Sequence, residues 1–103
     1  MVYKPELAVL GEVLHALGAA GRGCTVPLTA RLWHNDGDAP QNGALSDLYA
    51  RVREGGLPLE IGGGEGNLGF GKGVNRLLRD CKSPYVLVLN QDAIPEPGAI
   101  ERL

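Results

Sequence analysis

Carboxylate and amide side chains follow two apolar segments of the chain, and these are the residues best suited to chemistry. The segment 84–89 is apolar without polar alternation, and Asn90, Gln91 and Asp92 follow it directly. A strand that is apolar on both faces is typical of the interior of a parallel sheet. Ligands of such sheets bind beyond the carboxyl ends of the strands, so Asp92 is expected at a small-molecule site. The alternative is that Asp92 only caps the next turn.

A second polar cluster follows the segment 25–33, whose β-branched, aromatic and apolar residues predict another strand. Asn35, Asp36 and Asp38 belong to this cluster. If the sheet is parallel, the cluster lies at the same edge as Asp92, and two acidic groups converge there. Asn and Asp beside a glycine are also ordinary turn residues, so a purely structural role is the alternative.

The glycine-rich stretch 62–73 precedes a predicted helix, and loops of this kind let backbone N–H groups approach phosphates. A dinucleotide fingerprint fails here, because Val74 stands where its third glycine is required. A P-loop fits from Gly66 through Gly71 and Lys72, but Gly73 replaces the Ser or Thr whose hydroxyl binds magnesium. A P-loop-like nucleotide-binding protein therefore stays open as an alternative.

The elements that position these residues alternate between strand and helix. Helical spacing of apolar residues predicts a first helix after Pro5, with His15 as a partly buried packing residue, and a second helix over 44–54. A third helix after the glycine loop should bury a stripe formed by Val74, Leu77, Leu78 and Cys81, with Lys72, Arg76 and Arg79 on a solvated face. Strands are expected near 29–34, 57–61 and 85–90. This order predicts a three-layer α/β fold, with a mostly parallel sheet and helices on both faces.

Length and composition restrict the class of protein. The 103 residues suffice for a single domain, and a net charge of −2 with scattered Lys and Arg provides no basic face for nucleic acid. Cys24 and Cys81 lie far apart, which argues against a zinc site or a disulfide framework. The sequence has no signal pattern and no apolar run long enough to span a bilayer. We therefore expect a soluble, cytoplasmic protein.

Two motifs, read together, resemble a known family. The stretch Asn67-Leu-Gly-Phe-Gly-Lys-Gly-Val-Asn75, followed by Val86-Leu-Val-Leu-Asn-Gln-Asp-Ala-Ile-Pro-Glu-Pro-Gly98, is similar to motifs of family-2 glycosyltransferases of GT-A fold. The similarity is greatest to their rhamnosyltransferase-like branch. Asn35-Asp-Gly-Asp38 looks like the "D-N-G-S" turn of these enzymes, and Tyr3 looks like the tyrosine that ends their first strand. The resemblance extends over nearly the whole chain.

The resemblance implies that residues 1–103 are the donor-binding half of an enzyme. This enzyme would transfer sugar from a nucleoside-diphospho-sugar to an acceptor glycan or lipid-linked sugar. It also implies that Asp92 meets a divalent metal, Mg or Mn, bound to the donor diphosphate. Asn67 should brace the glycine loop, and Asn75 should point inward and bond to a neighbouring loop. The donor-binding residues implied by the resemblance are Tyr3, Asn35, Asp36, Asn67, Gly69, Asn75 and Asn90.

The chain departs from the family pattern in three places. Asn35-Asp36 reverses the usual order of the turn, and Gln91 replaces the usual proline. The chain also begins at the end of the expected first strand and stops before the acceptor-binding half, which carries the family's general base. We therefore expect a truncated domain that has no assignable catalytic residue, is inactive alone, and can pair with a second copy. The remaining alternative is a noncatalytic nucleotide-sugar-binding module, and a peripheral position at the inner membrane face is compatible with either.

Overall fold

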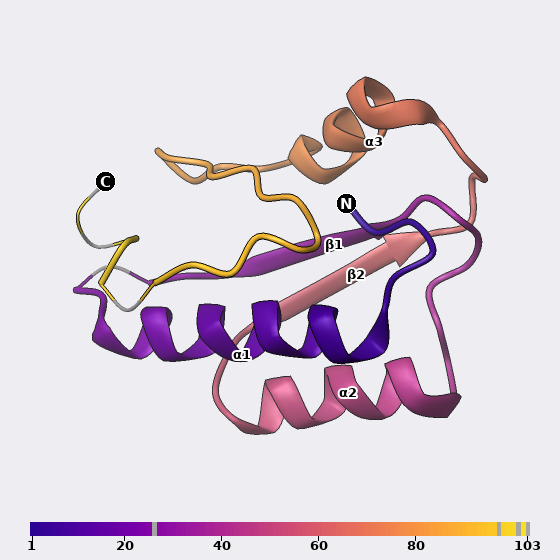
Figure 1. Cartoon of the computed structure of the whole chain (residues 1–103). Helices are drawn as coiled ribbons and strands as arrows, with labels where there is room; N and C mark the ends of the chain where they lie inside the picture. Colours follow the sequence, from indigo (N-terminus) through magenta and orange to yellow (C-terminus); the bar gives the residue numbers. More distant parts are fainter. Residues whose placement is uncertain (26, 97, 101, 103) are drawn as a thin grey trace.

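The computed structural model describes the whole chain except residues 26, 97, 101 and 103. Its described part is a small α/β structure with three helices and a two-stranded parallel sheet (Figure 1). In chain order the elements are α1 (Leu7–Gly23), β1 (Ala30–His34), α2 (Gly43–Glu54), β2 (Leu59–Gly63) and α3 (Gly69–Leu78).

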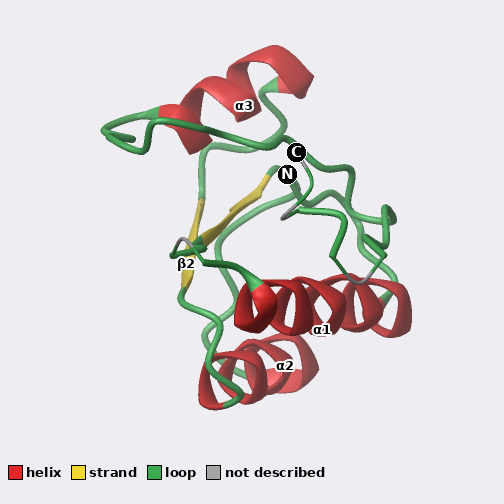
Figure 2. Ribbon diagram, turned by 90° about the vertical axis from the view of Figure 1, so that its left-hand side faces the viewer, coloured by secondary structure: helices red, strands yellow, loops and turns green. Residues whose placement is uncertain are grey.

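The parallel sheet confirms two of the three predicted strands. β1 pairs with β2 from Ala30 opposite Leu59 to His34 opposite Gly63, so both carboxyl ends lie at one edge. Val2 adds a single parallel bridge to His34 on the other side of β1. Helices α1 and α2 lie on one side of this sheet and α3 lies on the other, as two perpendicular views agree (Figures 1 and 2).

The third predicted strand, over 85–90, is wrong in this structure. These residues form no strand, and Tyr85 is 91% exposed, while Val86, Leu87 and Val88 are about half exposed. An apolar segment becomes a strand only when a neighbouring strand satisfies its backbone groups. Within the described residues, the edge of β1 away from β2 is bridged by Val2 alone, which is too short to form a ladder. The broader three-layer sheet therefore stays a prediction.

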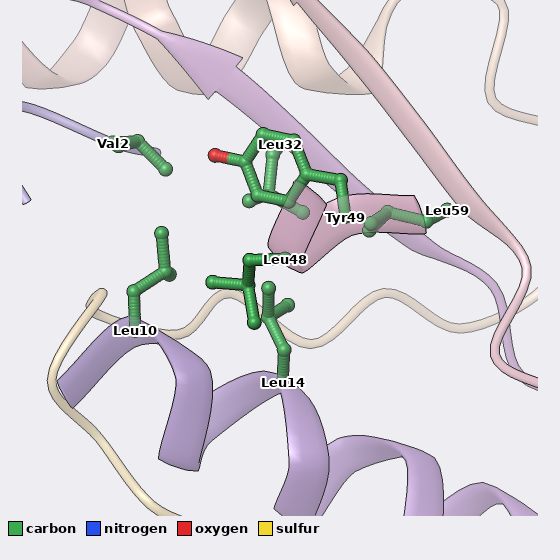
Figure 3. Close-up of a cluster of buried hydrophobic side chains, with 7 residues drawn as sticks. All are labelled: Val2, Leu10, Leu14, Leu32, Leu48, Tyr49 and Leu59. Carbon is green, nitrogen blue, oxygen red and sulfur yellow. The ribbon is translucent and has the colours of Figure 1, made fainter. Parts of the chain in front are cut away.

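The core lies between the sheet and the two helices α1 and α2. Leu10 and Leu14 of α1 belong to this core, and Leu48 and Tyr49 come from α2. Both helices thus confirm the sequence pattern, but His15 is exposed, so its predicted packing role is wrong. It follows Leu14 by one residue, about 100° around the helix, and so lies beside the buried stripe. Figure 3 shows the complete cluster, which also contains Val2, Leu32 and Leu59.

Helix α3 is attached to the sheet mainly by polar and close backbone contacts. The Arg31 guanidinium on β1 donates hydrogen bonds of 3.0 Å to the carbonyl oxygens of Leu77 and Arg79, at the end of the helix. These bonds satisfy carbonyls that have no partner within the helix. The predicted buried stripe is confirmed only in part, because Val74, Leu77 and Cys81 are half-buried while Leu78 is exposed. Arg76, expected in solvent, pairs with Glu65 at 2.8 Å.

Among the helices of the described part, none combines the length and apolar character needed to cross a bilayer.

Candidate functional site at the carboxyl ends of the strands

Asn35 connects the end of β1 to the glycine loop. Its side chain is buried, with the residue 2% exposed, and its Nδ2 donates a 2.9 Å hydrogen bond to Asn67 Oδ1. In return, Asn35 Oδ1 accepts a 2.9 Å bond from the Leu68 backbone N–H. Asn67 Oδ1 also accepts the Gly69 N–H at 2.9 Å, so the predicted bracing of the loop by Asn67 is confirmed. Gly69 has φ +79°, a left-handed conformation that favours glycine.

Two glycines let the glycine loop lie directly against the turn that follows β1. A Cβ added to Gly63 would lie 2.7 Å from the Gly37 carbonyl oxygen and 2.9 Å from His34 Cβ. Side chains cannot be accommodated at such distances. The Gly64 N–H donates a 2.8 Å bond to the same Gly37 carbonyl. The glycines therefore allow the backbone of the glycine loop to lie close to the turn after β1, in addition to any role in ligand binding.

Asp36 fastens the N-terminal segment to this edge. Its Oδ2 accepts a 2.8 Å hydrogen bond from the Lys4 backbone N–H, and Lys4 itself has φ +43°. This left-handed residue turns the chain sharply after Tyr3. The Tyr3 side chain is 42% exposed beside the turn, with Lys4 Nζ 5.4 Å from the centre of its ring.

Gln91 brings the segment that follows residues 85–90, which form no strand, to the same N-terminal residues. Its Oε1 accepts the Tyr3 N–H at 2.8 Å, and its Nε2 donates to the Tyr3 carbonyl at 3.0 Å. Asp92 follows it, and a cavity of about 290 Å³ opens here between the N-terminal segment and the start of α1. Asp36 therefore contacts Lys4, and Asp92 borders a cavity that Lys4 also lines, but Asp36 does not line this cavity. The convergence of the two acidic groups stays a prediction. The cavity is lined by Lys4, Pro5, Glu6, Val9, Leu10, Gln91 and Asp92.

A buried Tyr–His pair, which the sequence analysis did not identify, lies behind Asp36. His34 Nε2 is 2.7 Å from the Tyr49 hydroxyl, and His34 Nδ1 is 3.5 Å from Asp36 Oδ1. Burial lowers the pKa of His34, against the opposing effect of the Asp36 carboxylate. Burial also raises the pKa of Tyr49 to about 12, and the Asp36 charge adds to this effect. Tyr49 follows the core residue Leu48 on α2. Its position beside an apolar helical stripe is the sequence feature that could have identified it as buried.

The remaining predicted site residues do not join this cluster. Asn75 lies on α3 with its side chain exposed, and it makes no side-chain hydrogen bond to another described residue. The expectation that it points inward is therefore wrong. Asn90 is also exposed, and its carbonyl accepts the Ala93 N–H at 3.1 Å in a turn. Gly71 and Lys72 belong to the first turns of α3 instead of the preceding loop.

The protein side chains at this site could hold a divalent metal only together with ligand atoms from a bound molecule. Within the described ranges, no three His, Cys, Asp or Glu side chains gather as a ready-made metal site. Asp92 is exposed and borders the cavity, where a single carboxylate could contribute one oxygen ligand. Mg²⁺ typically binds through one or two carboxylates together with substrate phosphates and water, so such a metal would arrive with a diphosphate.

In comparisons with known proteins, no family model, no curated protein and no solved structure matches the chain.

Proposed function

We propose that the chain binds a nucleoside-diphospho-sugar and forms the donor-binding half of a glycosyltransferase of GT-A type. The observation that supports this best is the pair of contacts at the carboxyl ends of the parallel strands, Asp36 with Lys4 and Tyr3 with Gln91, next to a cavity that Asp92 lines. The sequence motifs that resemble the family supply most of these residues. Sites beyond the carboxyl ends of parallel strands are the usual position for small-molecule ligands.

Each residue has a role that its chemistry suits. The half-exposed Tyr3 ring offers a face on which a nucleobase can stack, and the Asp36 carboxylate can accept hydrogen bonds from a ribose or a base. Asp92 would hold a divalent cation together with the donor diphosphate. A cation there supplies Lewis-acid stabilisation of the negative charge on the departing nucleoside diphosphate. The described residues offer no group assignable as general base, so acceptor activation is not part of the proposal.

The P-loop alternative has less support from the geometry. In that motif the backbone N–H groups of the whole loop surround the phosphates, and the helix follows the loop. Here α3 begins at Gly69, two residues before Gly71, so the loop available to surround phosphates is shorter than the motif requires. The site also lacks the hydroxyl at Gly73. A noncatalytic module that binds the same donor differs from the enzyme only in the acceptor step.

Titration calorimetry with UDP and dTDP, each with and without Mn²⁺, tests the proposal. We expect weak binding that Mn²⁺ strengthens, and we expect Asp92→Asn to abolish the metal-dependent part while the fold is retained. Asp47→Asn, an exposed position on α2, is the matched control and should bind as the wild type does. A preference for ATP would instead support the P-loop alternative. Metal-independent binding that Asp92→Asn leaves unchanged, or no binding of either nucleotide, would refute the proposed site.

A further inference from the structure

A continuous chain of polar contacts joins α2 to the N-terminal segment through the inside of the molecule. The Tyr49 hydroxyl contacts His34 Nε2, His34 Nδ1 faces Asp36 Oδ1, and Asp36 Oδ2 accepts the Lys4 N–H. Tyr49 and His34 are 1% and 2% exposed, so neither can exchange its partner for water. Figure 3 shows the Tyr49 ring inside the apolar cluster, pointing its oxygen away from Leu59. Buried polar groups of this kind are costly unless every one of them is paired.

The donor and acceptor capacity of each group decides where the protons lie in this chain of polar contacts. Because burial lowers the pKa of His34, the ring is neutral at pH 7 and has a single N–H. The Asp36 carboxylate can only accept, so that proton belongs on Nδ1. Nε2 must then accept, and the Tyr49 hydroxyl, whose pKa is raised to about 12, stays protonated and donates to it. Only this arrangement gives the Tyr49 hydroxyl an acceptor and turns an N–H, instead of a lone pair, towards Asp36 Oδ1, which lies 3.5 Å from His34 Nδ1.

We propose that Tyr49 and His34 are positioning residues, which hold the Asp36 carboxylate in place for the nucleoside part of the donor. The inference rests on the proposed function for its ligand, but its hydrogen-bond pattern can be tested without one. Asp36 is the group in the chain that is partly open to solvent, with its side chain 24% exposed. With one oxygen facing His34 and the other held by the Lys4 N–H, the carboxylate is pre-oriented before a ligand arrives. Such pre-orientation is a recognised source of binding affinity.

The first test is nitrogen NMR of the two histidine rings in ¹⁵N-labelled protein at pH 7.5. We expect His34 to show one fixed tautomer, protonated on Nδ1 and unprotonated on Nε2, while the exposed His15 serves as an internal reference. Tyr49→Phe keeps the ring and removes the hydroxyl, so the His34 Nε2 resonance should shift. Tyr85→Phe, the same change at a 91% exposed position, should leave it unchanged. A wild-type His34 protonated on Nε2 would overturn the inference, and this result needs no variant to fold.

The second test compares UDP affinity among the same proteins. Loss of one hydrogen bond in the chain should weaken binding about three- to tenfold in Tyr49→Phe. Tyr85→Phe should bind as the wild type does. If the wild type binds UDP and Tyr49→Phe binds it equally well, the positioning role is refuted while the proposed function stands. If the wild type binds no nucleotide, the proposed function fails, and the ring-nitrogen spectra alone then support or overturn the hydrogen-bond chain.

Discussion

Replacing Asn35 by alanine should destabilise the protein more than the same change at the exposed Asn75. The buried side chain donates to Asn67 Oδ1 and accepts the Leu68 N–H, each at 2.9 Å. Two lost hydrogen bonds cost about 1 kcal/mol each, and a half-buried N–H left unpaired adds to this, so we expect a loss of about 2–3 kcal/mol. For a domain of this size, such a loss lowers Tm by roughly 10 °C or more. The same change on α3, Asn75→Ala, should stay within about 0.5 kcal/mol.

Urea-induced unfolding, followed by the fluorescence of the single tryptophan, Trp33, measures both variants directly. Trp33 lies on β1, one residue before the carboxyl end of the strand, so it reports on the region being perturbed. A third variant, Asn67→Asp, keeps an oxygen that can accept the Asn35 amide and the Gly69 N–H, and it should cost less than Asn67→Ala. Equal midpoints for Asn35→Ala and Asn75→Ala would refute the reasoning that Asn35 holds the glycine loop.

Two further predictions concern close packing and pH. Gly63→Ala should destabilise the protein by about 1–3 kcal/mol, because its new Cβ would lie 2.7 Å from a backbone oxygen. Gly71→Ala, with open space around it on α3, should stabilise the protein by about 0.5–1 kcal/mol. Thermal unfolding of both variants checks this, and a Gly63→Ala variant as stable as the wild type would contradict it. Because the folded-state pKa of Tyr49 is about 12, above the unfolded value of about 10, its stabilising contribution is complete below pH 10 and is lost as pH rises towards 12. The unfolding free energy of the wild type should therefore fall more steeply over this range than that of Tyr49→Phe, and parallel slopes would show that Tyr49 titrates normally.

The sequence predicted those parts of the fold that depend on local pattern. Helix α1, the covering helix α2 and the strands expected near 29–34 and 57–61 follow from apolar periodicity and turn residues, although the second strand, β2, lies two residues further along, at Leu59–Gly63. Parallel pairing of the strands then placed Asp36 and the glycine loop at one edge. The bracing role of Asn67 was expected from the resemblance alone, and its physical basis is that an asparagine just before a helix commonly bonds to backbone N–H groups.

Features that depend on tertiary contacts could not be predicted in the same way. His34 falls at the end of a predicted strand, but the sequence does not show that it lies on the buried face of β1, where Tyr49 of α2 can reach it. Asn75 was expected to face inward, but the end of α3 is held by Arg31, which leaves Asn75 on the exposed side. Such contacts join residues that are far apart in the chain, so no local periodicity reports them.

The segment after Tyr85 shows how one side chain can replace a missing strand contact. A backbone neighbour of Tyr3 would offer one C=O and one N–H, and the Gln91 carboxamide offers the same two groups at 2.8 and 3.0 Å. A proline at this position could not make these two contacts, because it has no side-chain amide. Gln91 brings Asp92 to the cavity although residues 85–90 form no ladder with the sheet. The position of the acidic residue thus depends on Gln91, and the proposed metal contact can exist without the strand that was expected to carry it.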